Sequence, residues 1–286
     1  MKKVFSLIFI SIFLGGAMHS QKNDLKIMSF NIRMDRAPDG INQWSNRKEW
    51  VAELIKFYDI DILGCQEVTA NQLHDLQNRL SEYEFVGVGR DDGKEAGEFS
   101  PLFFRKERFE MLATQTFWLS QTPHLVSKGW DANYFRIATW AELIDKNSRD
   151  TFFVFNTHFD HIAVEARKHS VVLLREKVQQ IAGNRLAFIT GDFNFSEQTE
   201  YYKSITKDSA QLIMFFDSHK LAQSTYGPSW TFQGFGQVPL KEREKIDFIF
   251  TTQPSQIKVK QSAIVSEQRD SIFPSDHFPL FIEIGY

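Results

Sequence analysis

The sequence contains a single cysteine among its 286 residues, and this scarcity excludes two common ways of stabilising a protein. One cysteine cannot form an internal disulfide bond, and there is no set of thiolates for a structural zinc site. Cys65 lies in the apolar run DIDILGCQEV, so we expect it to pack as a small hydrophobic side chain. The protein therefore has no disulfide framework.

Two motifs that identify common enzyme classes are also missing. The sequence has no glycine-rich phosphate-binding loop and no nucleophile elbow around a serine, which argues against a nucleotide kinase and a serine hydrolase. An excess of basic residues is absent as well, because 33 Lys and Arg accompany 36 Asp and Glu. Proteins that bind phosphate backbones non-specifically are usually basic. The charge therefore argues mildly against a dedicated DNA-binding protein.

One apolar run, residues 4–14, stands out at the N-terminus. It follows Lys2 and Lys3 and precedes small residues up to Ser20, which is the layout of a secretory signal peptide. The run is too short to span a bilayer. We therefore predict a signal peptide over residues 1–20, cleavage near Ser20, and export to the periplasm or the cell exterior. A retained anchor or a buried N-terminal strand is the alternative.

Residues 24–286 contain no linker, repeat or change of composition, so we predict one domain over this range. Phe is unusually frequent at 28 copies, which favours an interior rich in β-sheet. Runs rich in β-branched and aromatic residues are typical of strands. Such runs cover residues 25–32, 60–66, 100–105, 135–143, 151–158, 185–193, 245–250 and 278–284.

Three amphipathic helices are predicted between these strands, near residues 46–58, 69–80 and 163–182. We expect the first helix to begin at Asn46, with Glu49 completing a capping box, and to bury Phe57. The second helix repeats the capping pattern with Thr69 and Gln72.

The third helix carries an apolar stripe and is expected to end at Gly183. Arg167 falls on that stripe, four residues before Val171. An inward-facing arginine needs a partner, and both a structural carboxylate and a substrate anion remain open. Strands mixed with helices predict an α/β protein. The strands between 100 and 143 follow one another too closely for crossover helices, so the sheets must be partly antiparallel and packed on each other.

Acids, amides and imidazoles close several of the predicted strands. A rigid scaffold can hold catalytic groups together where strand ends converge. Carboxylates and amides without thiolates favour a hard cation such as Mg²⁺ or Mn²⁺, and Glu67 is the best first ligand. Two histidines could stabilise charge on a phosphoryl oxygen, and a separate aspartate could orient a water. The residues are Asn31, Glu67, His158, Asp160, Asp192, Asn194, Asp247, Asp276 and His277.

Each of these residues also has a purely structural interpretation. Asp192 and Asn194 could stabilise a turn through bonds from side chain to backbone, and so could Asn31. Asp160 and His161 follow His158 directly and could support it or simply belong to a polar loop.

Six segments in this order resemble the endonuclease/exonuclease/phosphatase superfamily: SFNIR, QEV, NTHFD, GDFN, IDFIF and SDHFP. That superfamily includes pancreatic deoxyribonuclease, apurinic endonucleases, neutral sphingomyelinases and inositol polyphosphate 5-phosphatases. The similarity covers nearly the whole chain after the N-terminal run and looks most like that of secreted bacterial members. It implies a four-layer α/β/β/α sandwich with two packed mixed sheets and a catalytic domain over residues 24–286.

The resemblance also implies a metal-dependent phosphoric ester hydrolase. Glu67 would bind Mg²⁺ or Mn²⁺, supported by Asn31 and Asp276 directly or through water. Asp192 would orient or deprotonate the water that attacks phosphorus.

The remaining catalytic roles follow from the same resemblance. Asn194 and His158 would hold the non-bridging oxygens. Asp247 would pair with His277 and favour its imidazolium, which would bind the phosphoryl group.

The substrate stays open at this stage. The segment HFDHIAVEAR lacks the tyrosine of apurinic endonucleases, and the glycine-rich, mixed-charge segment 90–109 is expected to line the cleft. Arg90, Glu98 and Arg136 are candidates for substrate contact, although a solvated turn with ordinary ion pairs would use the same residues. The partner would be a phosphate ester of a sugar, an inositol, a lipid headgroup or nucleic acid. An exported nuclease and a non-catalytic binding protein are the alternatives.

Overall fold

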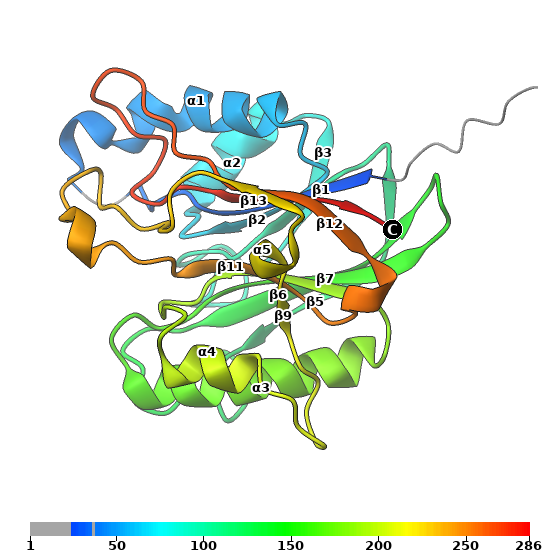
Figure 1. Cartoon of the computed structure of the whole chain (residues 1–286). Coiled ribbons are helices and arrows are strands. Elements are labelled where there is room, and N and C mark those ends of the chain that lie inside the picture. The colour runs from blue at the N-terminus through cyan, green and yellow to red at the C-terminus, as the bar shows by residue number, and fades with distance from the viewer. Residues whose placement is uncertain (1–23, 36–37) are drawn as a thin grey trace, which may run out of the picture.

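Two β-sheets pack face to face and carry helices on their outer faces, as Figure 1 shows. The computed structural model describes residues 24–35 and 38–286. The signal peptide predicted over residues 1–20 lies outside the described residues. The layers run helix, sheet, sheet, helix, which confirms the predicted four-layer α/β/β/α sandwich.

The first sheet has 7 strands in the order β10-β12-β13-β1-β2-β4-β3. β1 pairs with β2 in parallel, as does β10 with β12, and the remaining neighbours are antiparallel. The sheet is therefore mixed, as predicted. The strands are β1 (Asp24–Asn31), β2 (Ile62–Gln66), β3 (Tyr83–Val86), β4 (Leu102–Arg105), β10 (Ser224–Tyr226), β12 (Lys258–Ile264) and β13 (Leu280–Gly285).

The second sheet has 6 strands in the order β5-β6-β7-β8-β11-β9. Only β7 and β8 are parallel, and the other neighbours are antiparallel. The strands are β5 (Phe109–Trp118), β6 (Ile137–Asp145), β7 (Thr151–His158), β8 (Ala187–Asp192), β9 (Phe216–Asp217) and β11 (Asp247–Thr251).

The longer helices cover the outer faces of the sheets. In Figure 1, α1 and α2 lie over the first sheet, and α3 and α4 lie over the second. No helix within residues 24–35 and 38–286 is both long and apolar enough to cross a membrane. The helices are α1 (Trp44–Phe57), α2 (Ala70–Arg79), α3 (Val164–Ala182), α4 (Glu200–Ile205) and α5 (Ser218–Leu221), with 3-10 turns η1 (Gly40–Asn42), η2 (Leu240–Glu242) and η3 (Pro254–Gln256).

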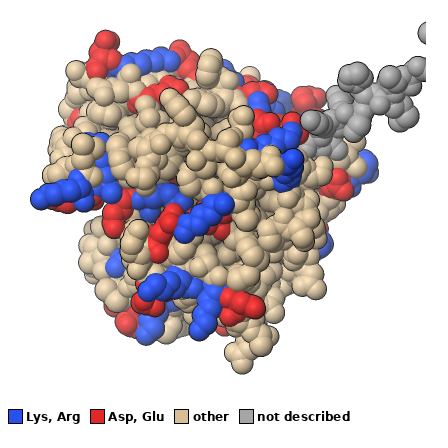
Figure 2. Space-filling view, viewed as in Figure 1, with Lys and Arg blue, Asp and Glu red and all other residues tan. Residues whose placement is uncertain are grey.

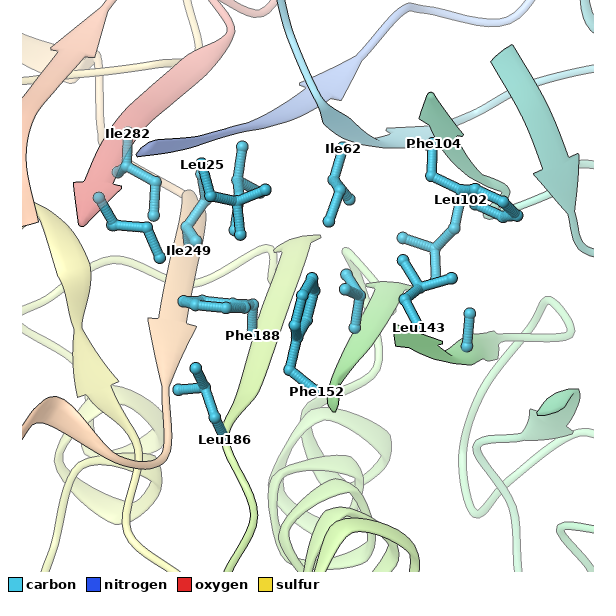
Figure 3. Packing of buried hydrophobic residues seen from close by; sticks show 14 of the residues in the cluster. Leu25, Ile62, Leu102, Phe104, Leu143, Phe152, Leu186, Phe188, Ile249 and Ile282 are labelled. Carbon is cyan, nitrogen blue, oxygen red and sulfur yellow. The ribbon is translucent and has the colours of Figure 1, made fainter. Parts of the chain in front are cut away.

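A continuous apolar layer fills the space between the sheets. Figure 3 shows Leu25 and Ile62 of the first sheet facing Phe152, Phe188 and other side chains of the second. One further apolar cluster lies between each sheet and the helices that cover it. The cluster under α3 and α4 consists largely of phenylalanine rings. The many phenylalanines therefore fill the apolar layers of the sandwich, where large rings bury much apolar area.

Polar side chains interrupt this apolar layer at the end where the sheets approach the candidate site. Asn156 of β7 donates to the carbonyl oxygens of Cys65 (2.6 Å) and Pro101 (2.9 Å) in the first sheet. Its own oxygen accepts from Gln66 at 2.7 Å and from Thr190 at 3.0 Å. The amide is fully buried and fully bonded, so it links the two sheets directly.

The helix ends follow the sequence signals in two of three cases. The capping box of Thr69 and Gln72 is present, and α3 ends at Gly183, whose φ is 60°. The first helix was predicted wrongly in two respects. It begins at Trp44, before Asn46, and Phe57 is 81% exposed because the buried stripe continues to Tyr58 instead.

All eight predicted strands are present, and the strands that were missed are those with weak patterns. β5 is an edge strand whose exposed residues include both polar and apolar side chains, and its register shifts between Met111 and Ala113, so its sequence shows little regular alternation. β12 contains a bulge between Val259 and Gln261, which shifts its alternation by one residue. β3, β9 and β10 have at most four residues each.

We expect the substitution Gly64→Ala to destabilise the fold. A Cβ atom at Gly64 in β2 would lie 2.1 Å from Oγ1 of Thr190 and 2.7 Å from Oδ1 of Asn156, so the two sheets would have to separate. Overpacking of this kind costs about 1–3 kcal/mol or more in the free energy of unfolding. Urea denaturation measures the change.

Gly285→Ala in β13 is the matched control, since the nearest atom to its Cβ would be Cε of the flexible Lys260 side chain at 3.3 Å. Equal stability of the two variants would show that the sheets do not depend on the close approach at Gly64.

Candidate active site

The strand registers bring three of the predicted residues into one row of the second sheet. Parallel pairing of β7 with β8 sets His158 beside Asp192, and antiparallel pairing of β8 with β11 sets Asp192 beside Asp247. All three are buried. Asp192 ends β8 and Asp247 begins the antiparallel strand β11, so the two residues meet at the same edge of the sheet.

The first sheet contributes the other half of the cluster in the same way. β1 ends at Asn31, which pairs with Gln66, and Glu67 follows immediately. Glu67 has a φ of 59°, a left-handed conformation that a non-glycine residue rarely adopts. Asp276 and His277 precede β13, which runs antiparallel to β1 and so begins at the same edge.

Asp192 lies at the centre of the cluster. The Asn31 amide donates to Oδ2 of Asp192 at 2.9 Å and to Oε1 of Glu67 at 3.2 Å, which joins the two sheets. Nε2 of His158 lies 3.5 Å from the same Asp192 oxygen, and Nε2 of His277 lies 3.8 Å from it. The structure therefore brings five of the predicted residues together: Asn31, Glu67, His158, Asp192 and His277.

His277 and Asp247 form a buried pair, with Nδ1 of the imidazole 2.8 Å from Oδ2 of the carboxylate. Burial alone would lower the pKa of His277, but Asp247 and Asp192 raise this pKa to about 10. His277 is therefore an imidazolium at neutral pH. Phe232 packs against its ring at a centroid distance of 5.0 Å.

His158 is held in the opposite state. Burial, with the positive charges of Arg136 and Arg90, lowers the pKa of His158 well below its usual range. It is therefore neutral at neutral pH and can donate a hydrogen bond from one ring nitrogen only. Two histidines whose pKa values are separated in this way can perform different tasks in one site.

The pKa values of the buried carboxylates shift in different directions. Burial and the neighbouring Asp247 raise the pKa of Asp192 to about 7. Burial also raises the pKa of Asp276. For Glu67, burial acts in the same direction, but His277 and the Met34 amide lower its pKa overall.

The donor set fits a hard divalent cation. One ligand atom from each of Glu67, His158 and Asp192 lies within 4.8 Å of the others, and the same is true of Asp192, Asp247 and His277. A cation near these buried carboxylates would remove the repulsion between them, and oxygen ligands are those that Mg²⁺ and Mn²⁺ prefer. Asn31 turns its NH₂ group to Glu67 and Asp192, so in this structure it orients the carboxylates.

Asp276 is placed beside a cation of the chain itself. Its Oδ1 accepts from the Ser275 hydroxyl at 3.2 Å, and Nη1 of Arg33 lies 3.6 Å from its Oδ2. Arg33 also pairs with Asp39 through two bonds of 3.2 Å. Sequence reasoning did not select Arg33, although it ends the segment SFNIR that contains Asn31.

A cavity of about 800 Å³ opens over this cluster. That size is within the range of small-molecule sites. Asn194 lines the cavity with a φ of 51°, and its NH₂ group donates to the carbonyl of Phe159 at 3.0 Å while its backbone amide donates to Asp192. Asn194 therefore both stabilises the turn and faces the cavity.

The predicted substrate-binding residues divide into two groups. Arg90, Glu98 and Arg136 line the cavity, and Arg90 forms two bonds of 2.7 Å with the two carboxylate oxygens of Glu98. Glu98 in turn lies 3.9 Å from Nδ1 of His158. Other cavity residues were not selected from the sequence because they belong to irregular loops without a pattern: Lys128, Asn133, Tyr134 and Phe232.

Asp160 and Arg167 lie outside the cavity lining. Oδ1 of Asp160 accepts from the backbone amides of Ile162 and Ala163, both at 2.8 Å, so this oxygen stabilises the turn before α3. Arg167 was expected to meet a carboxylate or a substrate anion. Instead its Nη1 donates to the carbonyl of Asp160 at 2.9 Å and its guanidinium covers the ring of Tyr201. Arg167 has no carboxylate partner among the described residues, and its contact with a substrate anion stays a prediction.

A model of the "Endonuclease/Exonuclease/phosphatase family" matches residues 28–277. The chain belongs to this family. Members include hydrolases of both phosphatase and nuclease type, and the two packed mixed sheets are those of the family's solved structures.

Two solved structures from Bacteroides resemble the chain closely. An endonuclease/exonuclease/phosphatase from Bacteroides vulgatus is 43% identical, with a TM-score of 0.87, over 92% of this chain and 99% of that one. A mannosyl-6-phosphatase from Bacteroides thetaiotaomicron is 33% identical, with a TM-score of 0.85, over 92% of this chain and 100% of that one.

Among curated proteins, the uncharacterized protein L388 of Acanthamoeba polyphaga mimivirus is 28% identical over 166 residues. The match covers 55% of this chain and 62% of that protein, so the chain spans less than two thirds of this relative.

We expect Mn²⁺ or Mg²⁺ to raise the melting temperature of the wild-type protein, because a cation that binds only the folded state stabilises it by about 2.7 kcal/mol at 100 times its Kd. In Glu67→Gln the increase should be much smaller. Differential scanning fluorimetry with and without a chelator measures it.

Glu110→Gln, an exposed position on β5, is the control and should respond as the wild type does. An undiminished metal-dependent increase in Glu67→Gln would place the cation elsewhere.

Proposed function

We propose that this protein is an exported, Mg²⁺- or Mn²⁺-dependent phosphatase that hydrolyses sugar phosphate monoesters by direct attack of water. The observation that carries the proposal is the convergence of Glu67, Asp192 and the two differently charged histidines at the floor of one cavity. The 33% identity to a mannosyl-6-phosphatase over nearly the whole chain supports the choice of substrate.

The charge of the surface favours a small substrate over a nucleic acid. The sequence carries a net charge of −3, and Figure 2 shows Lys and Arg interspersed with Asp and Glu on the face it presents. A protein that follows a phosphate backbone needs a basic stripe beside its site. The cavity wall instead pairs its arginines with acids, as in Arg90 with Glu98.

Glu67 and Asp276 are the residues proposed to hold the cation. When bound, the cation supplies positive charge that polarises the phosphoryl group and lowers the pKa of a coordinated water. Glu67 suits this role because its pKa is lowered, so it is ionised at neutral pH and needs no proton loss before binding.

Asp192 is proposed to orient the attacking water and accept its proton. Its central position and its contact with the Asn31 amide fix the carboxylate, and a pKa of about 7 is suited to a general base at neutral pH. The proton would pass to Oδ2 or Oδ1 of Asp192 as the water oxygen bonds to phosphorus and the bond from phosphorus to the sugar oxygen breaks. The departing sugar oxygen would take a proton from solvent water in the open cavity, which leaves a sugar hydroxyl and inorganic phosphate.

His277, His158 and Asn194 line the cavity and would face the oxygens of the phosphoryl group. The His277 imidazolium would donate from Nε2, since its Nδ1 is engaged with Asp247. Because negative charge grows on these oxygens in the transition state, a fixed cationic donor stabilises that state more than the ground state.

The proposal is tested by a hydrolysis screen with Mg²⁺ or Mn²⁺, with and without chelator. The screen covers sugar phosphates, inositol phosphates, phospholipid headgroups, RNA and DNA, and measures both phosphate release and diester cleavage. We expect chelator-sensitive phosphate release from sugar phosphates. Faster cleavage of nucleic acid would favour a nuclease, and no hydrolysis of any substrate would favour a binding protein.

We expect Asp192→Asn and His277→Ala each to lower kcat by roughly 10²–10⁴, because each removes a proton acceptor or a charged donor from the transition state. Their melting temperatures should stay near that of the wild type. Asp150→Asn, an exposed substitution between β6 and β7, is the control. Wild-type turnover in either site variant would remove that residue from the mechanism.

We expect Asp247→Asn to shift the alkaline limb of the pH profile to lower pH. Activity that needs the His277 imidazolium is present below the pKa of His277 and is lost as pH rises through it. Asp247 raises that pKa, so removing its charge brings the loss to lower pH. The kcat/KM of both proteins between pH 6 and about 10 measures the shift. An unmoved limb would show that His277 charge does not limit the reaction.

Export is a further part of the proposal, and the apolar run at residues 4–14 supports it. N-terminal sequencing of protein from cell fractions tests it, with cleavage near Ser20 as the expected result.

A further inference from the structure

One buried arginine in the cavity wall has donors that the described residues do not satisfy. Arg136 is 4% exposed and lines the cavity, yet its Nε and Nη1 have no hydrogen-bond partner in the described part of the chain. Nη2 contacts Nδ1 of His161 at 3.0 Å, and the acid beside it, Asp160, lies 3.5 Å from Nε. Buried donors without partners are costly, so the chain itself leaves this guanidinium incompletely bonded beside the cavity.

The neighbouring ion pair supplies acceptors as well as donors. Arg90 and Glu98 are buried and joined by two bonds, so their charges balance. Each carboxylate oxygen of Glu98 keeps a second lone pair. Nε of Arg90 has no hydrogen-bond partner among the described residues, and Oδ1 of Asp91 lies 3.9 Å from it. This part of the wall can therefore both accept a hydrogen bond and donate one.

An aromatic ring lies across both arginines. The ring centroid of Tyr134 is 5.7 Å from the guanidinium carbon of Arg90 and 5.9 Å from that of Arg136. The ring also stacks on His161 at 6.0 Å. Tyr134 is 46% exposed, so a large part of it remains available for contact with a ligand in the cavity that it lines.

The chemistry of this wall matches a ring that carries hydroxyl groups. This part of the wall has little excess positive charge to hold a second anion, because Glu98 balances Arg90 and Asp160 lies 3.5 Å from Nε of Arg136. An apolar group would make no hydrogen bond to Glu98 or to the two arginines that line the cavity. A sugar hydroxyl accepts from arginine and donates to carboxylate, while the C–H groups of the sugar ring pack on an aromatic side chain.

We propose that Arg90, Glu98, Arg136 and Tyr134 form a subsite for the sugar ring that leaves when the phosphate ester is hydrolysed. The inference rests on the proposed phosphatase function and adds to it the residues that select the leaving group. Glu98 adjoins His158, so the subsite borders the groups proposed to hold the phosphate.

The test compares two kinds of alkyl phosphate that differ in hydroxyl groups. The first are glucose, galactose and mannose 6-phosphates, and the second is cyclohexylmethyl phosphate, which has a six-membered ring on a primary phosphate ester and no hydroxyls. The ratio of their kcat/KM values is the selectivity. We expect the wild type to prefer at least one hexose phosphate by a large factor, because buried polar groups left unpaired penalise the other substrate.

Two variants should lose this selectivity. Tyr134→Ala removes an exposed ring whose hydroxyl makes no hydrogen bond to the described residues, so the fold should be unaffected. Arg136→Lys keeps the positive charge but removes the planar guanidinium. We expect each to lower the selectivity roughly 10- to 100-fold, the effect of one or two lost contacts. Tyr226→Ala is the matched control, since Tyr226 is 80% exposed on β10 and does not line the cavity.

Three outcomes contradict the inference, and they are distinguishable from one another. Equal losses on both kinds of substrate would mean that these residues act on the phosphate group, which overturns the subsite and leaves the phosphatase function intact. A wild type without preference for any hexose phosphate would overturn the subsite as well. No chelator-sensitive hydrolysis of either kind would overturn the proposed function and the subsite together.

Discussion

The site depends on the hydrogen bonds that Asn156 makes across the gap between the two sheets. Its amide reaches the carbonyl oxygens of Cys65 and Pro101 on the opposite sheet, and its oxygen accepts from Gln66. His158 lies two residues beyond Asn156, and Glu67 follows Gln66 directly. The distance between the two sheets at this point therefore also sets the distance between the proposed metal ligand and the proposed phosphate-binding histidine. An apolar contact could bring the sheets together, but only directional bonds fix their relative position along the strands.

The electrostatics of the site oppose the stability that the sheets provide. Asp192, Asp247 and Asp276 are buried within a small volume, and the pKa values of Asp192 and Asp276 are raised because water does not solvate their charges. The His277 imidazolium compensates only part of this charge. The uncompensated negative charge of the cluster fits the divalent cation of the proposed function, and the cation and the His277 imidazolium would together balance the charge of a phosphate. The hydrogen bonds of Asn156 and the large apolar layer between the sheets hold these groups in place against their repulsion.

How far the sequence predicts this site depends on whether a residue ends a strand. Glu67, His158, Asp192 and Asp247 could be selected because an apolar run places each at the edge of a sheet, and register then brings them together. Tyr134 and Phe232 lie in irregular segments whose path is set by tertiary packing, so no periodicity points to them. Arg167 shows a different limit of sequence patterns. Its helical position is inward, but a long side chain can turn to a backbone carbonyl and an aromatic ring, which periodicity does not describe.

The residues proposed to act on phosphorus and those proposed to bind the sugar also lie in different kinds of segment. The groups proposed to act on phosphorus stand on strand ends of both sheets, so the pairing of the strands fixes their positions relative to one another. Arg90 and Glu98 belong to the segment between β3 and β4, while Tyr134 and Arg136 lie between β5 and β6. These segments can change sequence without altering the strand pairs that hold Asp192. A family whose members include phosphatases and nucleases would be expected to vary in such segments, because the phosphoryl group is common to the substrates and only the group attached to it differs.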